Sequence, residues 1–314
     1  MAPHPIGTVT RGTTNPNRLR RMDRWIAATH GAELRRATTP LAVDLGYGAA
    51  PWTAVELLRR LRAAAPRTQV VGIEIDPARV AAAEPYECEG LTFRHGGFEV
   101  PVPGRPTLIR AANVLRQYDE EEVTAVWARL CARLEPATHH STGGTHSTGG
   151  THSIDGTHST GGGPRSSHSP SSSGPRSPHS PSSSSGPHST GGLLVEGTCD
   201  EIGRRHVWVA LGPEGPRTIT FATRLGSLDR PSDLAERLPK ALIHRNVPGE
   251  PVHAFLRDFD RAWAAAAPYA SYGARQRWIR TVRALSADWP VRDGETRWRQ
   301  GEVTVTWEAL APRG

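Results

Sequence analysis

The segment Leu41–Ala50 constrains the fold more than any other part of the chain. It begins as a short apolar strand that contains one acid, Asp44, and it runs directly into Gly46–Gly48. A helix is predicted next, over Trp52–Ala65. Two glycines between a strand and a helix let the backbone turn sharply and approach a ligand closely. This segment therefore predicts a strand-turn-helix unit whose turn forms one wall of a binding site.

The same alternation of strand and helix continues along the chain. A second buried strand, Gln69–Ile75, is followed by Asp76 and Pro77, where proline suits the first position of a helix. Alternating strands and helices predict an α/β fold with a largely parallel sheet. The other predicted strands are Leu91–His95, Thr107–Ala112, 193–196, His206–Leu211, Arg217–Thr223 and Glu302–Glu308, and the other predicted helices are Asn17–Arg36, Asp119–Leu134, Val252–Ala267 and Ser271–Ala287.

A tract rich in serine, glycine, histidine and proline interrupts this pattern over residues 137–192, where Ala137 and Ile154 are the only apolar residues. Without apolar periodicity the tract cannot offset the entropy of ordering, and we expect it to be disordered. Its removal would raise the apolar share of the chain from 37% to about 44%, close to that of an ordinary globular domain. Eight of the fourteen histidines lie in the tract, but repeat expansion explains them better than metal binding, and no metal site is predicted.

The tract follows a predicted helix and precedes a predicted strand, which indicates an insertion at one turn of one domain. We therefore expect a flexible arm over 1–16 and a single domain over 17–136 and 191–314, with the insertion over 137–190. Lengthening a loop to this extent costs only about 2–3 kcal/mol of closure entropy, which a stable domain tolerates. Residues 225–290 are expected to form a helical cap for the substrate.

The net charge of +7 comes from arginine, since Lys240 is the only lysine. This usage is typical of a high-GC bacterium. The arginines are spread along the chain apart from a modest cluster at Arg18, Arg20, Arg21 and Arg24. A nucleic-acid partner is therefore compatible with the charge but not favoured by it.

The cysteines Cys88, Cys131 and Cys199 are too widely spaced for a disulfide framework or a CxxC metal pair. The first residues lack the apolar core of a signal peptide, and no run of eighteen apolar residues predicts a membrane span. We expect a cytoplasmic protein with reduced thiols and no membrane contact, whose oligomeric state the sequence leaves open.

The second predicted strand ends in a carboxylate, Glu74, which follows Gly48 by 26 residues and so leaves room for one helix between them. The carboxyl ends of parallel strands meet at one edge of the sheet, and ligands bind there. A carboxylate in this place suits the two hydroxyls of a ribose. Glu74 and the glycine turn together predict a ligand that contains a nucleoside.

Asp44, Gly46 and Gly48 match an acidic-x-Gly-x-Gly motif, and with Glu74 they make the chain resemble the class I S-adenosylmethionine-dependent methyltransferases, of the actinobacterial type. The resemblance implies a Rossmann-like, doubly wound sheet of seven strands, mostly parallel with an antiparallel last strand. It also implies S-adenosyl-L-methionine as the cofactor, with the glycine loop under its methionine part and Glu74 on its ribose.

The same resemblance assigns further contacts. Gly97 and Phe98 are expected near the adenine, and Asn113 near the transferred methyl group. Arg18 is added to them for its charge, which could meet an acidic substrate or the cofactor carboxylate. Ala50 replaces a third glycine of the family, and Gly97 stands where an aspartate is common. The predicted cofactor-binding residues are Asp44, Gly46, Tyr47, Gly48, Glu74, Ile75, Gly97, Phe98, Asn113 and Arg18.

Three other functions stay open. A nicotinamide dinucleotide is disfavoured because Pro51 stands at the third glycine of its fingerprint. A nucleic-acid methyltransferase is disfavoured because residues 113–116 lack the Asn-Pro-Pro-Tyr type of segment. A non-catalytic or regulatory protein that retains the fold is the main alternative to an enzyme acting on a small-molecule acceptor.

No catalytic residue is assigned from the sequence. Methyl transfer from a sulfonium is an in-line displacement that needs mainly proximity and orientation, so a dedicated base is optional. His95, Tyr118 and His206 are candidate bases, although a structural role is expected for each. Arg21 and Arg110 are candidates to meet an acidic substrate or the cofactor carboxylate.

Overall fold

A computed structural model describes residues 4–137 and 191–313. Its strands are β1 (Leu41–Leu45), β2 (Gln69–Glu74), β3 (Leu91–His95), β4 (Leu108–Ala112), β5 (Leu193–Cys199), β6 (Arg205–Gly212), β7 (Gly215–Thr223) and β8 (Glu302–Thr306). They form one sheet in the order β3-β2-β1-β4-β5-β6-β7-β8. The first five strands run parallel, and β6, β7 and β8 each pair antiparallel with the strand before them.

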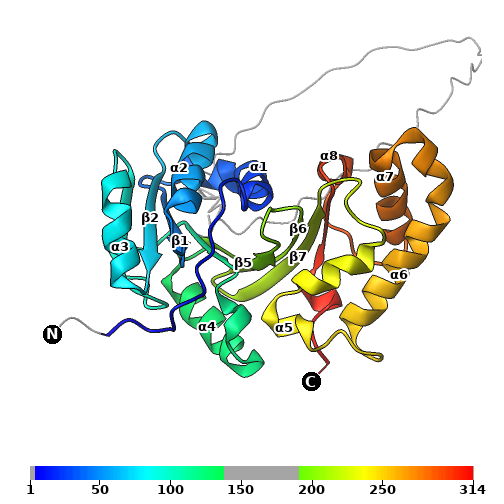
Figure 1. Cartoon of the computed structure of the whole chain (residues 1–314). Helices are drawn as coiled ribbons and strands as arrows, with labels where there is room; N and C mark the ends of the chain where they lie inside the picture. The colour runs from blue at the N-terminus through cyan, green and yellow to red at the C-terminus, as the bar shows by residue number, and fades with distance from the viewer. Residues whose placement is uncertain (1–3, 138–190, 314) are drawn as a thin grey trace, which may run out of the picture. The chain divides into compact units, whose positions relative to one another are not determined.

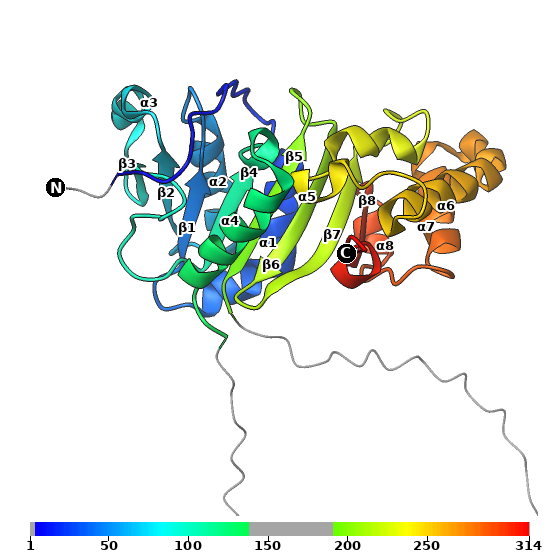
Figure 2. The same cartoon turned by 90° about the horizontal axis from the view of Figure 1, so that it is seen from below.

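Helices cover both faces of this sheet (Figures 1 and 2). They are α1 (Arg20–Arg36), α2 (Trp52–Ala64), α3 (Pro77–Ala83), α4 (Glu120–Arg133), α5 (Lys240–Ile243), α6 (Pro251–Ala265), α7 (Ala274–Leu285) and α8 (Glu295–Trp298). Apolar residues of α1, α2 and α3 share one core with one face of the sheet, and those of α4, α5, α6 and α7 share another core with the opposite face.

Strand β1 shows how the sequence divides these two cores. Successive side chains of a strand point to opposite faces. Val43 and Leu45 accordingly belong to the core under α4, whereas Ala42 belongs to the core under α1 and α2. Asp44 shares the face of Ala42, so its carboxylate is directed at the helices α1 and α2 rather than at solvent.

The expected α/β class is confirmed. The sheet contains eight strands, as the apolar patterning predicted, and not the seven that the resemblance implied. Each of the last three strands, rather than the last alone, pairs antiparallel with the strand before it. For β6 and β7 the reason is local. Short turns join β5 to β6 through residues 200–204 and β6 to β7 through residues 213–214. A direct turn reverses the chain, whereas a parallel neighbour requires a crossover of a dozen or more residues.

Helix α1 begins at Arg20 rather than at the predicted Asn17. Asn17 has a φ of 63°, in the left-handed region that a right-handed helix cannot contain. This turn separates α1 from residues 4–15, which we call the N-terminal arm. None of the helices in the two described ranges combines the length and the apolar character needed to cross a bilayer.

The segments that flank residues 138–190 meet at the amino end of β5. The N–H of Gly192 donates a hydrogen bond to the carbonyl oxygen of Glu135, with an N···O distance of 2.7 Å. This is the edge of the sheet opposite to the carboxyl ends of the parallel strands. The disordered insertion expected over 137–190 itself lies, apart from Ala137, outside the described residues.

Candidate functional site

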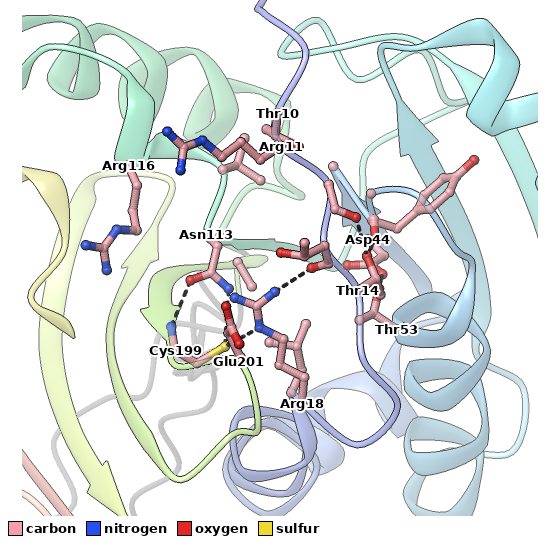
Figure 3. A pocket seen from close by; sticks show the side chains of 18 of the residues that line it. Thr10, Arg11, Thr14, Arg18, Asp44, Thr53, Asn113, Arg116, Cys199 and Glu201 are labelled. Atoms are coloured by element: carbon pink, nitrogen blue, oxygen red, sulfur yellow. Dashed lines mark hydrogen bonds between the residues drawn. The ribbon is translucent and has the colours of Figure 1, made fainter. Parts of the chain in front are cut away.

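A pocket of about 480 Å³ opens at the carboxyl ends of β1, β4 and β5, and we call it the main pocket. The order of the strands reverses between β1 and β4, and doubly wound sheets bind ligands at such a switch point. The N-terminal arm passes along one side of the pocket (Figure 3). Six of the ten predicted cofactor-binding residues line it, namely Asp44, Gly46, Tyr47, Gly48, Asn113 and Arg18.

The turn after β1 requires both of its glycines. Gly46 has a φ of 68° and Gly48 a φ of 87°, which side-chain-bearing residues rarely adopt. A Cβ atom on Gly46 would lie 2.8 Å from a methyl group of Val114, and one on Gly48 would lie 2.9 Å from the carbonyl oxygen of Gly12. The turn is therefore packed so closely on its neighbours that only glycine fits.

The carboxylate of Asp44 is held by a buried arginine, Arg110, on the neighbouring strand β4. The side chains of Arg110 and Asp44 are ion-paired at 2.8 Å, and Arg110 also pairs with Asp23 of α1. Thr53 donates a further hydrogen bond to Asp44, with an O···O distance of 2.7 Å. Burial lowers the pKa of Arg110, but the charges of Asp23 and Asp44 outweigh it and raise the pKa above its ordinary value.

Arg110 is therefore not the substrate contact that the sequence suggested. It is fully buried, and its guanidinium is saturated by two carboxylates and the carbonyl oxygen of Thr53. Its role is to neutralise Asp44 and to fix the carboxylate beneath the glycine turn. Arg21 lies outside the main pocket as well, in a separate groove beside α1.

The other predicted residues, Glu74, Ile75, Gly97 and Phe98, line a narrow extension of only about 20 Å³, which also touches Gly46. We call it the narrow end. The N-terminal arm fills it. The N–H of Phe98 donates to the carbonyl oxygen of Ile6 at 2.8 Å, and a Cβ on Gly97 would collide with that same oxygen.

Two further hydrogen bonds hold the arm in the narrow end. The N–H of Thr8 donates to the Tyr118 hydroxyl at 2.6 Å, and the N–H of Ile6 donates to Glu99 at 2.8 Å. The arm then continues to the glycine turn, where Ala49 donates to the carbonyl oxygen of Gly12 at 2.9 Å. The arm thus lies where the sequence predicted the ribose and adenine of a nucleoside.

Glu74 connects the second strand to the glycine turn. Its carboxylate accepts hydrogen bonds from the N–H groups of Gly48 at 2.9 Å and Ile75 at 3.0 Å. Arg79 lies 3.6 Å away and also donates to the carbonyl oxygen of Thr10 in the arm. Glu74 and the glycine turn therefore lie side by side, joined by a direct hydrogen bond from the N–H of Gly48.

Arg18 projects into the middle of the main pocket (Figure 3). Its guanidinium donates to the carbonyl oxygen of Thr13 at 2.6 Å, and to the sulfur of Cys199 at 3.3 Å. Asn113 donates to the same sulfur at 3.2 Å and has a φ of 61°. Strained backbone of this kind is common where a side chain is held for a ligand.

Arginine dominates the charge of the main pocket. Besides Arg18, its lining includes Arg11, Arg116 and Arg237, against the carboxylates of Asp44 and Glu201. The charge of Asp44 is already compensated by its ion pair with Arg110. Burial, followed by the charge of Arg237, lowers the pKa of Arg116, and the Nε of Arg237 is buried without a hydrogen-bond partner. These observations indicate a pocket that accepts an anionic group.

None of the three candidate bases lines the main pocket. His95 is exposed and lies 3.0 Å from the carbonyl oxygen of Ile75, and Tyr118 holds the arm. His206 is fully buried in β6, and burial lowers its pKa to about 4. Within 4–137 and 191–313, no three histidine, cysteine or acidic side chains gather as metal ligands.

Sequence reasoning missed several lining residues. Cys199 ends β5 and could have been found from its position, because the carboxyl ends of parallel strands meet at one edge. Thr10–Thr14 gave no signal, since an extended arm shows neither helical nor strand periodicity. The other missed residues are Leu19, Thr53, Ala112, Val114, Arg116, Gln117, Glu201 and Arg237.

No protein-family model and no curated protein sequence matches the chain. Solved structures with partial likeness include three methyltransferases. One is a riboflavin-derivative dimethyltransferase from Streptomyces davawensis (16% identity, 38% of each chain covered, TM-score 0.27), and another is a magnesium protoporphyrin IX methyltransferase from Synechocystis PCC 6803 with bound SAH (18%, 38% of this chain and 54% of that one, 0.28). The third is human N-acetylserotonin methyltransferase with SAM (22%, 38% of each, 0.25). The chain spans about two fifths to one half of the length of these proteins.

Proposed function

We propose that this chain binds S-adenosyl-L-methionine at the carboxyl edge of its sheet and transfers the methyl group to a small-molecule acceptor. One observation carries the proposal. A turn that only glycine can form and a set of arginines that can hold a carboxylate face the same pocket at the switch point of a doubly wound sheet. The volume of about 480 Å³ lies in the usual range of small-molecule sites.

The chain offers a partner for each part of an amino-acid sulfonium. Arg18, with Arg11 and Arg116 near it, supplies guanidinium groups for the carboxylate, and such charge-assisted hydrogen bonds are strong. The turn at Gly46–Gly48 lets the ligand lie close to the backbone. Bound here, the cofactor supplies an electrophilic methyl group, and the protein supplies proximity and orientation.

The nucleoside part does not fit the narrow end while the arm occupies it. A hollow of about 20 Å³ has room for little more than one water molecule. Removal of residues 6–8 would free the N–H of Phe98 for an adenine nitrogen and open the carboxylate of Glu74 to ribose hydroxyls. The proposal therefore requires this part of the arm to leave when the cofactor binds.

The same observation favours a second candidate function. If the arm never leaves the narrow end, the chain is a non-catalytic protein that retains the fold, with its own backbone in the place of the nucleoside. The two candidates differ in one measurable property, which is whether an adenosyl ligand can displace residues 6–8.

Isothermal titration with S-adenosylhomocysteine tests this choice, on the full chain and on a chain that lacks residues 1–9. We expect weak binding to the full chain and binding tighter by about tenfold or more after truncation, since three hydrogen bonds of the arm no longer compete. The truncated chain must first show cooperative unfolding. If it is folded and does not bind at about 1 mM ligand, the methyltransferase proposal is wrong and the second candidate holds.

A further inference from the structure

A second hollow of about 600 Å³ lies beside the main pocket, and seven of its twelve lining residues are arginines. It is formed by α1, the turn between β5 and β6, the residues after β7, the start of α7 and the residues after α8. No acidic residue lines it. We call it the arginine groove, and its arginines are Arg20, Arg21, Arg24, Arg204, Arg224, Arg275 and Arg299.

Most of these guanidinium groups lack a partner among the described residues. Arg299 pairs with Glu295 at 3.4 Å, and Arg21 donates to the carbonyl oxygen of Gln300 at 2.9 Å. The guanidinium groups of the other five make no hydrogen bond and no ion pair within 4–137 and 191–313, although the main-chain N–H of Arg204 donates to Asp200. The groove is thus a concentration of positive charge that the fold itself does not neutralise.

Arg21 shows that the like charges affect one another. Burial lowers the pKa of Arg21, the carboxylate of Glu302 partly opposes this change, and the charges of Arg24, Arg20 and Arg224 lower the pKa further. The Nε of Arg21 is also buried without a hydrogen-bond partner. An anion in the groove would relieve this repulsion and satisfy the buried donor at once.

The arginine groove borders a second hollow and lacks aromatic side chains. A neighbouring hollow of about 470 Å³ shares Arg21, Arg24 and Gln300 with it. Its other charged residues are Arg60, Arg297 and Glu302, and both of these arginines are already paired with carboxylates. No aromatic side chain lines either hollow, so neither offers a surface on which bases could stack. Recognition there would depend on charge and on the forked geometry of guanidinium groups, which matches phosphate oxygens in pairs.

The groove and the main pocket share a wall. Glu201 lines the pocket, whereas Ile202 and Arg204 of the same turn line the groove. On α1 and the turn before it, Arg18 faces the pocket and Arg20 faces the groove. The turn packs directly on this segment, because a Cβ on Gly203 would collide with the carbonyl oxygen of Arg18.

We propose that the arginine groove is a binding site for a ligand with several closely spaced phosphate groups. Its shared wall with the main pocket places such a ligand beside the proposed methyl donor. If the methyltransferase proposal holds, the phosphates belong to the acceptor substrate. Binding in the groove does not depend on that proposal, and it can be measured without any cofactor.

The test titrates inorganic tripolyphosphate into the full chain without a cofactor and repeats the titration with paired variants. Arg204→Gln with Arg224→Gln removes two exposed charges from the groove, and Arg36→Gln with Arg129→Gln removes two exposed charges elsewhere. We expect the first pair to weaken binding by about tenfold and the second by less than about twofold, with a salt dependence that is shallower in the first pair. Equal weakening in both pairs, or no binding at about 1 mM tripolyphosphate, would overturn the proposal.

A competition experiment identifies the source of the phosphates. A single-stranded RNA of about 16 nucleotides is added to the tripolyphosphate complex. Displacement that is lost in the Arg204→Gln, Arg224→Gln variant assigns the groove to a nucleic-acid backbone. Absence of displacement assigns it to a free oligophosphate or a phosphorylated small molecule. Both results agree with the proposal that the groove binds phosphate groups.

Discussion

The main-chain N–H of Phe98 donates a hydrogen bond to the carbonyl oxygen of Ile6, with an N···O distance of 2.8 Å. This contact joins the N-terminal arm to the loop after β3, at the place where the sequence predicted an adenine. An N–H at this position is a donor that either the arm or a ligand can use, but not both. The accessibility of the narrow end is therefore decided by a small number of main-chain hydrogen bonds.

Replacement of Tyr118 by phenylalanine should loosen the arm. The change removes the hydroxyl that accepts from Thr8 at 2.6 Å and leaves the ring in contact with Phe98. A hydrogen bond of this kind contributes about 1 kcal/mol, so S-adenosylhomocysteine should bind about fivefold more tightly in a calorimetric titration. Tyr86→Phe is the matched control, because Tyr86 is exposed and its ring packs against Trp52 rather than against the arm. Equal affinities for both variants would show that Tyr118 does not restrain the arm.

Gly48→Ala should lower the stability of the fold and weaken ligand binding at the glycine turn. Gly249→Ala should leave ligand binding unchanged and cost less stability. The two residues have similar positive φ values, 87° and 100°, and so share a strain of about 1 kcal/mol. Only at Gly48 does the new Cβ meet a neighbour, the backbone of Gly12 at 2.9 Å, whereas nothing lies within 4 Å at Gly249. Thermal unfolding should therefore show the larger loss for Gly48→Ala, together with weakened ligand binding. A similar loss in both variants would mean that the arm does not press on the turn.

Replacement of Arg110 by methionine should strongly destabilise the fold. Arg110 is fully buried between Asp23 and Asp44. Its removal leaves the buried carboxylate of Asp44 without an ionic partner and that of Asp23 with Arg60 alone. Breaking such a buried cluster costs about 3–5 kcal/mol of unfolding free energy, which urea denaturation can measure. Arg257→Met removes one partner of an exposed ion pair and should cost at most about 1 kcal/mol.

Removal of the two carboxylates tests whether Arg110 stabilises the fold by compensating their charge. If Arg110 acts by compensating the two carboxylates, then Asp23→Asn and Asp44→Asn added to Arg110→Met should recover a large part of the lost stability. A triple variant as unstable as Arg110→Met would show instead that packing of the arginine side chain is what matters.

Glu196 should make the stability of the fold depend on pH. It is buried in β5, and this burial, which the indole of Trp127 only partly opposes, raises the pKa of Glu196 to about 8. Between an unfolded pKa of 4.5 and that value, the folded protein keeps a proton that the unfolded chain has released. The unfolding free energy therefore falls as pH rises through this window, by roughly 5 kcal/mol, and does not fall further above it.

Glu196→Gln removes this contribution. The variant should match the parent near pH 4.5 and become increasingly more stable than the parent up to about pH 8, as urea denaturation at a series of pH values would show. A stability difference that stays constant across this range would contradict the raised pKa.

The sequence by itself determined the strand-turn-helix unit and its immediate partner. Strand β1 spans Leu41–Leu45 as predicted, the turn at Gly46–Gly48 needs its glycines, and Glu74 bonds to Gly48. These features are local or follow from one parallel pairing, and apolar patterning with glycine chemistry is enough to specify them. The α/β class follows from the same alternation.

Only the tertiary structure decided what surrounds that unit. Arg110 meets Asp44 and Asp23 across separations of 66 and 87 residues, and a buried arginine looks the same in sequence as an exposed one. The arm in the narrow end and the arginine groove likewise join segments that share no periodicity. Such contacts depend on how strands and helices are placed in space, which is why patterning predicted the turn but not the arm that closes it.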